Sequence, residues 1–193
     1  MRACLKKTVL LLCAGLSMTA ARAESETYVF DTQHTYPNFE VGHLGYSVRR
    51  GWFEKTEGRV TMDRAAGKGE MQVEIDAATI NTGLAIRDNI VRSDKFGFLD
   101  VARYPKITFR STRFEFEGQE LKRVLGDLTI KGTTKPVVLD IVALRCGQHP
   151  MKKVPMCGGE ARTVIQKKDF GEFGGSVLSD DIRLGLEFEA YKE

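Results

Sequence analysis

The chain has 193 residues, of which 42% are hydrophobic and 28% are charged, and its formal net charge is +3. This length suits one well-filled domain and is short for two. The basic excess belongs to the N-terminus: without Arg2, Lys6, Lys7 and Arg22 the 29 basic residues fall to 25, against 26 acidic residues, a net charge of −1. No cluster of lysine and arginine with interleaved aromatic residues follows, so nucleic-acid binding is disfavoured.

Residues 1–23 have the pattern of a secretory signal peptide. Basic residues precede a short apolar run over residues 8–20, and Ala21-Arg22-Ala23 supplies small residues around a cleavage site. We therefore expect the mature chain to begin at Glu24, to form one domain over residues 24–193 and to be exported to the periplasm. No later run reaches the roughly 18 apolar residues that a membrane-spanning helix needs.

Period-two alternation of apolar and polar residues dominates the mature chain. Met71, Val73 and Ile75 alternate with polar residues, and the same pattern runs through residues 181–189. Each such run predicts a strand with one buried face. Further strands are predicted, between turn signals, at residues 28–31, 39–48, 59–63, 107–109, 114–117, 121–131, 136–144 and 161–167.

About eight short strands with one polar face each are typical of a β-sandwich or an up-and-down barrel. We predict an all-β fold, an eight-stranded antiparallel lipocalin-like barrel with one short helical insertion near its mouth. A barrel of this size can be filled by its own side chains or can hold one small apolar ligand. The sequence pattern leaves both possibilities open.

His43 is a candidate for contact with a ligand. In the predicted strand it shares parity with Phe39 and Val41, so the three side chains face the same side. The alternative is a buried neutral imidazole bonded to a backbone carbonyl.

The helical insertion is predicted between Asn81 and Phe109, as a lid or plug. On a helix, Arg87 lies three or four positions from Leu84, Ile90 and Val91, so its guanidinium shares the apolar stripe that faces the core. Arg87 is therefore a candidate for binding a ligand oxygen, or else a side chain that covers the barrel rim. Asp88 is also a candidate ligand-binding residue, and its spacing to Arg92 predicts an exposed ion pair.

Aromatic residues are candidates for the mouth and lining of the barrel, and core packing is the alternative for each. Phe96 and Phe98 fall in an irregular segment after the helix, where they could gate a cavity. The full set of aromatic candidates is Phe39, Trp52, Phe53, Phe96, Phe98 and Phe109.

Cys146 and Cys157 are the only cysteines after the signal-like segment, and they bracket a loop with two prolines. In an exported protein this arrangement favours a disulfide. The alternative is a soft-metal site for copper, with ligands from Cys146, His149, Met151, Met156 and Cys157.

Seven motifs in chain order carry a family resemblance. They are Tyr28-Val29-Phe30-Asp31 with His34, residues 39–45, 73–82 and 87–94, Tyr104-Pro105-Lys106-Ile107-Thr108-Phe109, residues 126–137, and Lys168-Asp169-Phe170-Gly171. Together they resemble the YceI-like proteins, exported lipocalin-like barrels that bind polyisoprenoid lipids. The resemblance implies a bound isoprenoid quinone or polyprenyl chain, no cofactor, and transient exchange with a membrane or a membrane redox protein.

Catalytic motifs such as Gly-x-Ser-x-Gly and His-Glu-x-x-His are absent from the sequence, so we expect a binding protein without catalytic residues or a metal site. An enzyme acting on an isoprenoid would need Arg87, Asp88 and His43 to converge on its substrate. For lipid binding we expect one continuous apolar tube, lined by Phe39, Val41, Val73, Phe109, Leu128, Ile141 and Leu186.

Overall fold

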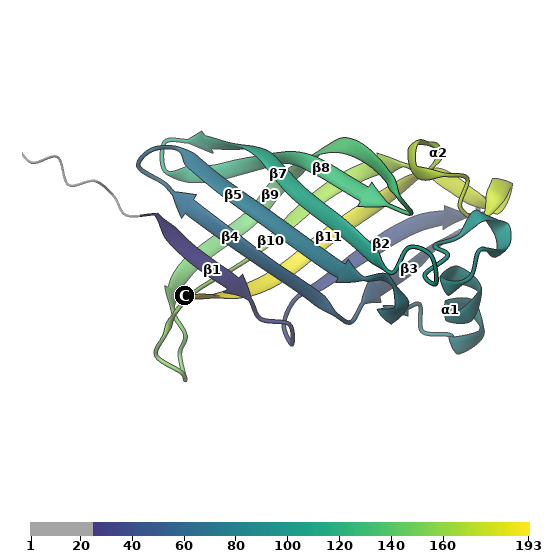
Figure 1. Ribbon diagram of the computed structural model, residues 1–193, viewed down its shortest axis with the longest axis horizontal. Helices are drawn as coiled ribbons and strands as arrows, with labels where there is room; N and C mark the ends of the chain where they lie inside the picture. The colour runs from purple at the N-terminus through teal and green to yellow at the C-terminus, as the bar shows by residue number, and fades with distance from the viewer. Residues whose placement is uncertain (1–24) are drawn as a thin grey trace, which may run out of the picture.

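The computed structural model describes residues 25–193, and the predicted signal peptide lies outside the described residues. Eleven strands form a single antiparallel sheet that closes on itself when β1 pairs with β11 (Figure 1). The strands are β1 Glu26–Phe30, β2 Tyr36–His43, β3 Ser47–Phe53, β4 Thr56–Asp63, β5 Lys68–Asp76, β6 Ile80–Asn81, β7 Lys106–Glu117, β8 Glu120–Ile130, β9 Thr133–Gln148, β10 Pro155–Gln166 and β11 Leu178–Lys192.

The eleven segments occupy eight strand positions around the barrel. Strands β1 and β2 lie end to end along β11, with Phe30 opposite Ala190 and Tyr36 opposite Glu187. In the same way β3 and β4 lie end to end, as do β5 and β6, because β3 pairs with β2 and β6 while β4 pairs with β1 and β5. All neighbours are antiparallel, so the predicted eight-stranded barrel is confirmed.

Predicted runs are divided into strands differently in the structure at two places. The predicted strand over residues 39–48 is two strands, β2 and β3, because Leu44 and Gly45 adopt positive φ angles of 54° and 72° and turn the chain back. The predicted runs 107–109 and 114–117 belong to one strand, β7, whose pairing with β8 shifts register between Ser111 and Arg113 and again between Glu115 and Phe116.

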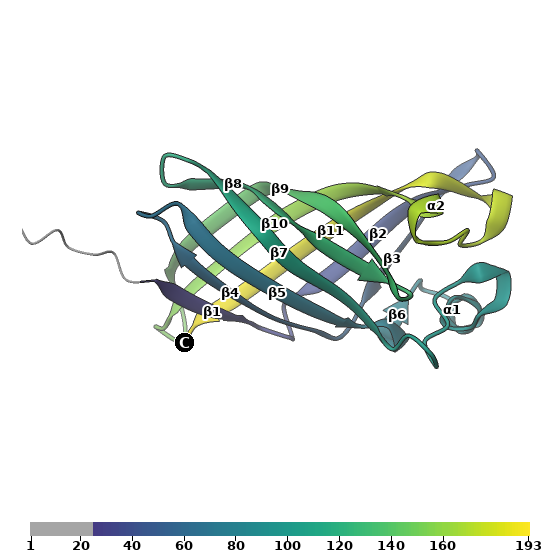
Figure 2. The same cartoon turned by 45° about the horizontal axis from the view of Figure 1, so that its top comes forward.

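Both helices lie at one end of the barrel (Figure 2). Helix α1, Ala85–Arg92, is the predicted insertion, whereas α2, Lys167–Phe170, was not predicted, because four residues are too few to show a helical period. Three 3₁₀ turns complete the structure: η1 Ala77–Thr79, η2 Lys95–Gly97 and η3 Gly175–Val177. Within residues 25–193, neither helix has the length and hydropathy needed to span a membrane.

The opposite end of the barrel is filled by its own side chains. Phe30 stacks on Phe188 with ring centroids 5.5 Å apart, and Phe114 packs against Phe116 at 6.3 Å. Val124, which faces the interior from β8, is almost completely buried. Large side chains from β1, β7, β8 and β11 therefore close this end, whereas the end that carries α1 and α2 holds a cavity.

Candidate functional site

An apolar cavity of about 530 Å³ lies in the helix-bearing end of the barrel. Its size falls within the range of roughly 300–1,000 Å³ that is typical of small-molecule sites. Strands on all sides of the barrel contribute aliphatic and aromatic side chains, and Ile90 and Val91 of α1 extend the apolar wall at the mouth. Since the far end is filled, the space is a blind cavity rather than a tube through the barrel.

The cavity floor is formed around Phe109 of β7. Gly126 on the neighbouring strand β8 leaves room for this ring, because a Cβ atom at Gly126 would stand 2.4 Å from Cζ of Phe109. Six of the seven residues predicted to line the interior do so: Phe39, Val41, Val73, Phe109, Leu128 and Leu186. Ile141 does not, because it lies beyond the floor and packs against the filled core.

The aromatic candidates divide between the cavity and the surface. Phe39 and Phe53 line the cavity with ring centroids 6.3 Å apart, and Phe98 also lines it. Trp52 is 40% exposed and lies outside the lining, because it precedes the inward-facing Phe53 and so points to the other face of β3. Phe96 is 71% exposed and also lies outside the lining.

Every ionisable residue in the cavity lining is basic, although Arg50 shares parity with Trp52 and directs its side chain to the outer face of β3. His43 ends β2, Arg49 and Arg50 lie on β3, and Arg87 projects from α1, so all four lie near the mouth. Arg87 donates one hydrogen bond to the carbonyl of Thr82 at 3.2 Å. Arg87 and His43 are therefore placed where the sequence predicted them.

Arg49 is a charged lining residue that sequence reasoning missed. It shares parity with Phe53, and it lies opposite Val41 of β2, which also faces the cavity. The single strand predicted over residues 39–48 ends before Arg49, so it gives no face for the Arg49 side chain. Recognition of the turn at Leu44 and Gly45 would have revealed this face.

Asp88 does not form the exposed ion pair with Arg92 that the helix spacing predicted. Asp88 is only 8% exposed, and one of its carboxylate oxygens accepts hydrogen bonds from the backbone N–H of Thr82 at 2.8 Å and from its hydroxyl at 2.6 Å. Arg92 instead donates to the carbonyls of Ala78 and Ile80. Both side chains are used to attach α1 to the end of β6, so Asp88 does not converge with Arg87 and His43 on the cavity.

Replacement of Asp88 by alanine should loosen this attachment. The change leaves the N–H and the hydroxyl of Thr82 without their acceptor, so we expect a loss of about 1–3 kcal/mol in the free energy of unfolding. Urea denaturation measures this loss, and the control is Asn89→Ala, which alters an exposed neighbouring residue. Equal midpoints for the two variants would contradict the role given to Asp88.

The two cysteines are joined. Cys146 and Cys157 form a disulfide between directly opposed positions of β9 and β10, at the barrel end away from the cavity. The pair therefore offers no thiolate to a metal, and Nδ1 of His149 accepts hydrogen bonds from the N–H groups of Met151 and Lys152. The disulfide prediction is confirmed and the copper alternative is wrong for this oxidised state.

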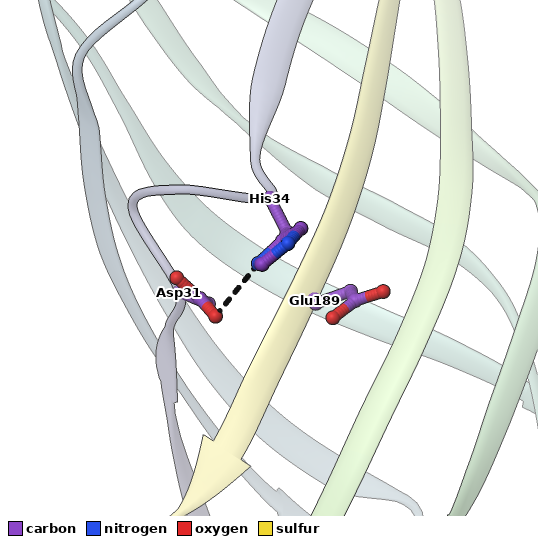
Figure 3. Close-up of side chains that lie close together, drawn as sticks. All are labelled: Asp31, His34 and Glu189. Carbon is purple, nitrogen blue, oxygen red and sulfur yellow. Dashed lines mark hydrogen bonds and ion pairs between the residues drawn. The ribbon is translucent and has the colours of Figure 1, made fainter. Parts of the chain in front are cut away.

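Asp31, His34 and Glu189 place potential ligand atoms within 4.8 Å of one another (Figure 3). His34 is exposed, and the Asp31 carboxylate accepts from Nδ1 of His34 and from the N–H of Gln33, each at 2.9 Å. Burial acts to raise the pKa of Asp31, but these hydrogen bonds outweigh it and lower the pKa overall. The contacts order the turn between β1 and β2, and none of the three residues lines the cavity.

The sequence comparisons agree with this architecture. The family model of the YceI-like domain matches residues 28–190. The chain belongs to the YceI-like family. It is 37% identical over 190 residues to "Protein YceI" of Escherichia coli O157:H7, covering 95% of this chain and 97% of that protein. It is 33% identical over 193 residues to a "UPF0312 protein" of Pseudomonas savastanoi pv. phaseolicola, covering 98% of this chain and 99% of the relative.

Solved structures of YceI-like proteins have the same fold. The Campylobacter jejuni YCEI protein is 30% identical, with a TM-score of 0.66 over 78% of this chain and 89% of that one. A polyisoprenoid binding domain from Saccharophagus degradans, at 16% identity, has a TM-score of 0.59 over 86% of this chain and 98% of that one. At this low identity the second likeness concerns the fold alone. The family, the barrel and its apolar interior support a lipid-binding barrel.

Proposed function

We propose that this YceI-like protein holds a lipid with a long prenyl tail, for carriage or storage. The blind, largely apolar cavity, whose charged residues all lie near its mouth, carries the proposal. Burial of one five-carbon isoprene unit contributes roughly 3–4 kcal/mol before ordering costs, at about 0.8 kcal/mol per CH₂. The binding activity named for the S. degradans domain is consistent with such a ligand.

The proposed ligand is an isoprenoid quinone or a polyprenyl lipid, and the proposed compartment is the periplasm. The disulfide supports this compartment, since disulfides persist in oxidising environments. In the bound complex the tail lies against Phe39, Val73 and Phe109, and the head group lies beside Arg87 and His43 at the mouth.

Organic extraction of protein purified from the periplasm tests the proposal directly. We expect mass spectrometry to find close to one equivalent of a prenyl lipid per protein chain. A matched preparation of Ala161→Phe should hold less, because Ala161 is buried in the cavity wall and the added ring occupies the cavity. An extract without prenyl lipid, from protein that also binds none when it is added, would refute the function.

Transfer of the lipid is proposed to occur on a bilayer that meets the mouth. Exposed apolar side chains surround it: Tyr46, 93% exposed, follows β2, and Ile86, 66% exposed, lies on α1. The backbone bond from the N–H of Leu44 to the carbonyl of Val177 holds the β2–β3 turn beside η3 at the same end. Such side chains can enter the boundary between head groups and acyl chains.

The double variant Tyr46→Ser, Ile86→Ser should therefore transfer lipid to vesicles several-fold more slowly, with little change in equilibrium affinity. Fluorescence transfer from labelled donor vesicles gives the rate. The matched control is Val142→Ser, Val164→Ser, which alters exposed residues on β9 and β10. Equal slowing in both double variants would argue against a bilayer contact at the mouth.

A further inference from the structure

We infer that the mouth of the cavity selects lipids with an anionic head group, phosphate or carboxylate, which Arg49 and Arg87 bind together. This inference rests on the proposed function, because it assigns a head group to a lipid whose tail occupies the cavity. It goes further by giving Arg49 a role and by favouring a charged head over a neutral quinone.

The charge of the lining is unbalanced. Among the described residues that line the cavity, none is a carboxylate, while His43, Arg49, Arg50 and Arg87 are all present. Arg50 is compensated, because Nε donates to the carboxylate of Glu40. Arg49 and Arg87 are not compensated in this way, so two positive charges remain at the mouth.

The hydrogen bonding of the two arginines is incomplete. A guanidinium carries five N–H donors. Arg87 uses one of them on the carbonyl of Thr82, and the side chain of Arg49 has no hydrogen-bond or ion-pair partner within residues 25–193. Both side chains are partly buried. Partly desolvated cations with free donors are stabilised strongly by an anion placed between them.

The fold brings both cations to the lining of the same cavity. Strand β3 pairs with β6 so that Trp52 lies opposite Asn81. Strand β6 ends at Asn81, and residues 82–84 lead from it directly into α1. Arg87 lies in the first turn of that helix. One cation therefore comes from the barrel wall and the other from the helix that covers the mouth.

The chemistry of the head group follows from this pair. A neutral quinone carbonyl can accept a hydrogen bond but leaves two like charges uncompensated. A phosphate monoester carries about −1.5 to −2 charge at neutral pH and three strong acceptor oxygens, and a carboxylate presents two oxygens in the geometry of a guanidinium fork. The apolar wall at Ile90 and Val91 then receives the attached chain.

The test compares two lipids that differ only in the head group, geranylgeranyl phosphate and geranylgeraniol, on delipidated protein. We expect the phosphate to bind on the order of tenfold to a hundredfold more tightly, the scale of charge-assisted hydrogen bonds. The preference should fall in Arg49→Met and in Arg87→Met and vanish in the double variant. The control Arg59→Met removes one positive charge from an exposed ion pair with Glu193 on the outer wall. It should leave the preference for the phosphate unchanged.

The possible outcomes separate the inference from the function on which it rests. Equal affinity for the two lipids in the unaltered protein overturns the anionic head group and leaves prenyl binding intact, whereas failure to bind either lipid overturns both. Inorganic phosphate alone should compete only weakly. If it binds as tightly as geranylgeranyl phosphate, the mouth is a site for a free anion and the head-group assignment is overturned. Should the methionine variants unfold, Arg49→Lys with Arg87→Lys keeps both charges and should retain part of the preference.

Discussion

Each isoprene unit removed from a bound prenyl lipid is expected to weaken binding by roughly tenfold, until the remaining tail no longer reaches the cavity floor. The gross gain of roughly 3–4 kcal/mol per buried unit is reduced by the ordering of rotatable bonds, which leaves a smaller net gain. Titration of delipidated protein with prenyl alcohols of increasing length measures the series. Affinity that does not depend on tail length would rule out the cavity as the site of the tail.

The cavity variant supplies the matched comparison. Ala161→Phe shortens the available space, so the affinity should stop rising at a shorter tail than in the unaltered protein. Ala143→Phe places the same ring on the exposed side of β9 and should leave the series unchanged. If both variants change the dependence of affinity on tail length equally, a general effect on the barrel explains the change. The assignment of the tail end to the cavity floor is then wrong.

Loss of the disulfide should lower the free energy of unfolding by about 3 kcal/mol, the value that loop-closure entropy gives for a short loop. Cys146 and Cys157 are separated by 11 positions and join β9 to β10 far from the cavity. We therefore expect the double variant Cys146→Ser, Cys157→Ala to unfold at a lower denaturant concentration while its affinity for a prenyl lipid is preserved.

Reduction of the unaltered protein is the control for this effect, because it breaks the same bond without removing the buried sulfur atom of Cys157. Denaturant midpoints with and without reductant should differ by nearly the same amount as the variant differs from the unaltered protein. A large loss of affinity on reduction would show that the far end of the barrel communicates with the cavity.

Local patterning was sufficient to predict the barrel and much of its lining. The alternation of Met71, Val73 and Ile75 shows directly which face of β5 is buried, since successive side chains of a strand point to opposite sides. The helical spacing of Arg87, Ile90 and Val91 likewise placed these three residues on the cavity side of α1. These predictions depended on single elements, whose periods are visible in the sequence.

Other features depended on the partners that distant segments supply. The helix spacing predicted a solvated pair between Asp88 and Arg92, but α1 lies against the end of β6, and unpaired backbone groups there take both side chains. Trp52 and Phe53 are adjacent aromatic residues, and only the pairing of β3 with its neighbours shows which one faces the cavity.

The sequence by itself determined that this protein is built of β-strands with one apolar face each, because alternation is a property of each strand alone, and the closure of these strands into a barrel required the pairing of β1 with β11. Only the tertiary structure decided that aromatic side chains fill one half of that interior and leave a blind cavity in the other. It also decided that Arg49 and Arg87 share the mouth. Side-chain volumes from eight strand positions must be summed across the barrel to know where space remains, and that sum depends on register, which strand pairing sets.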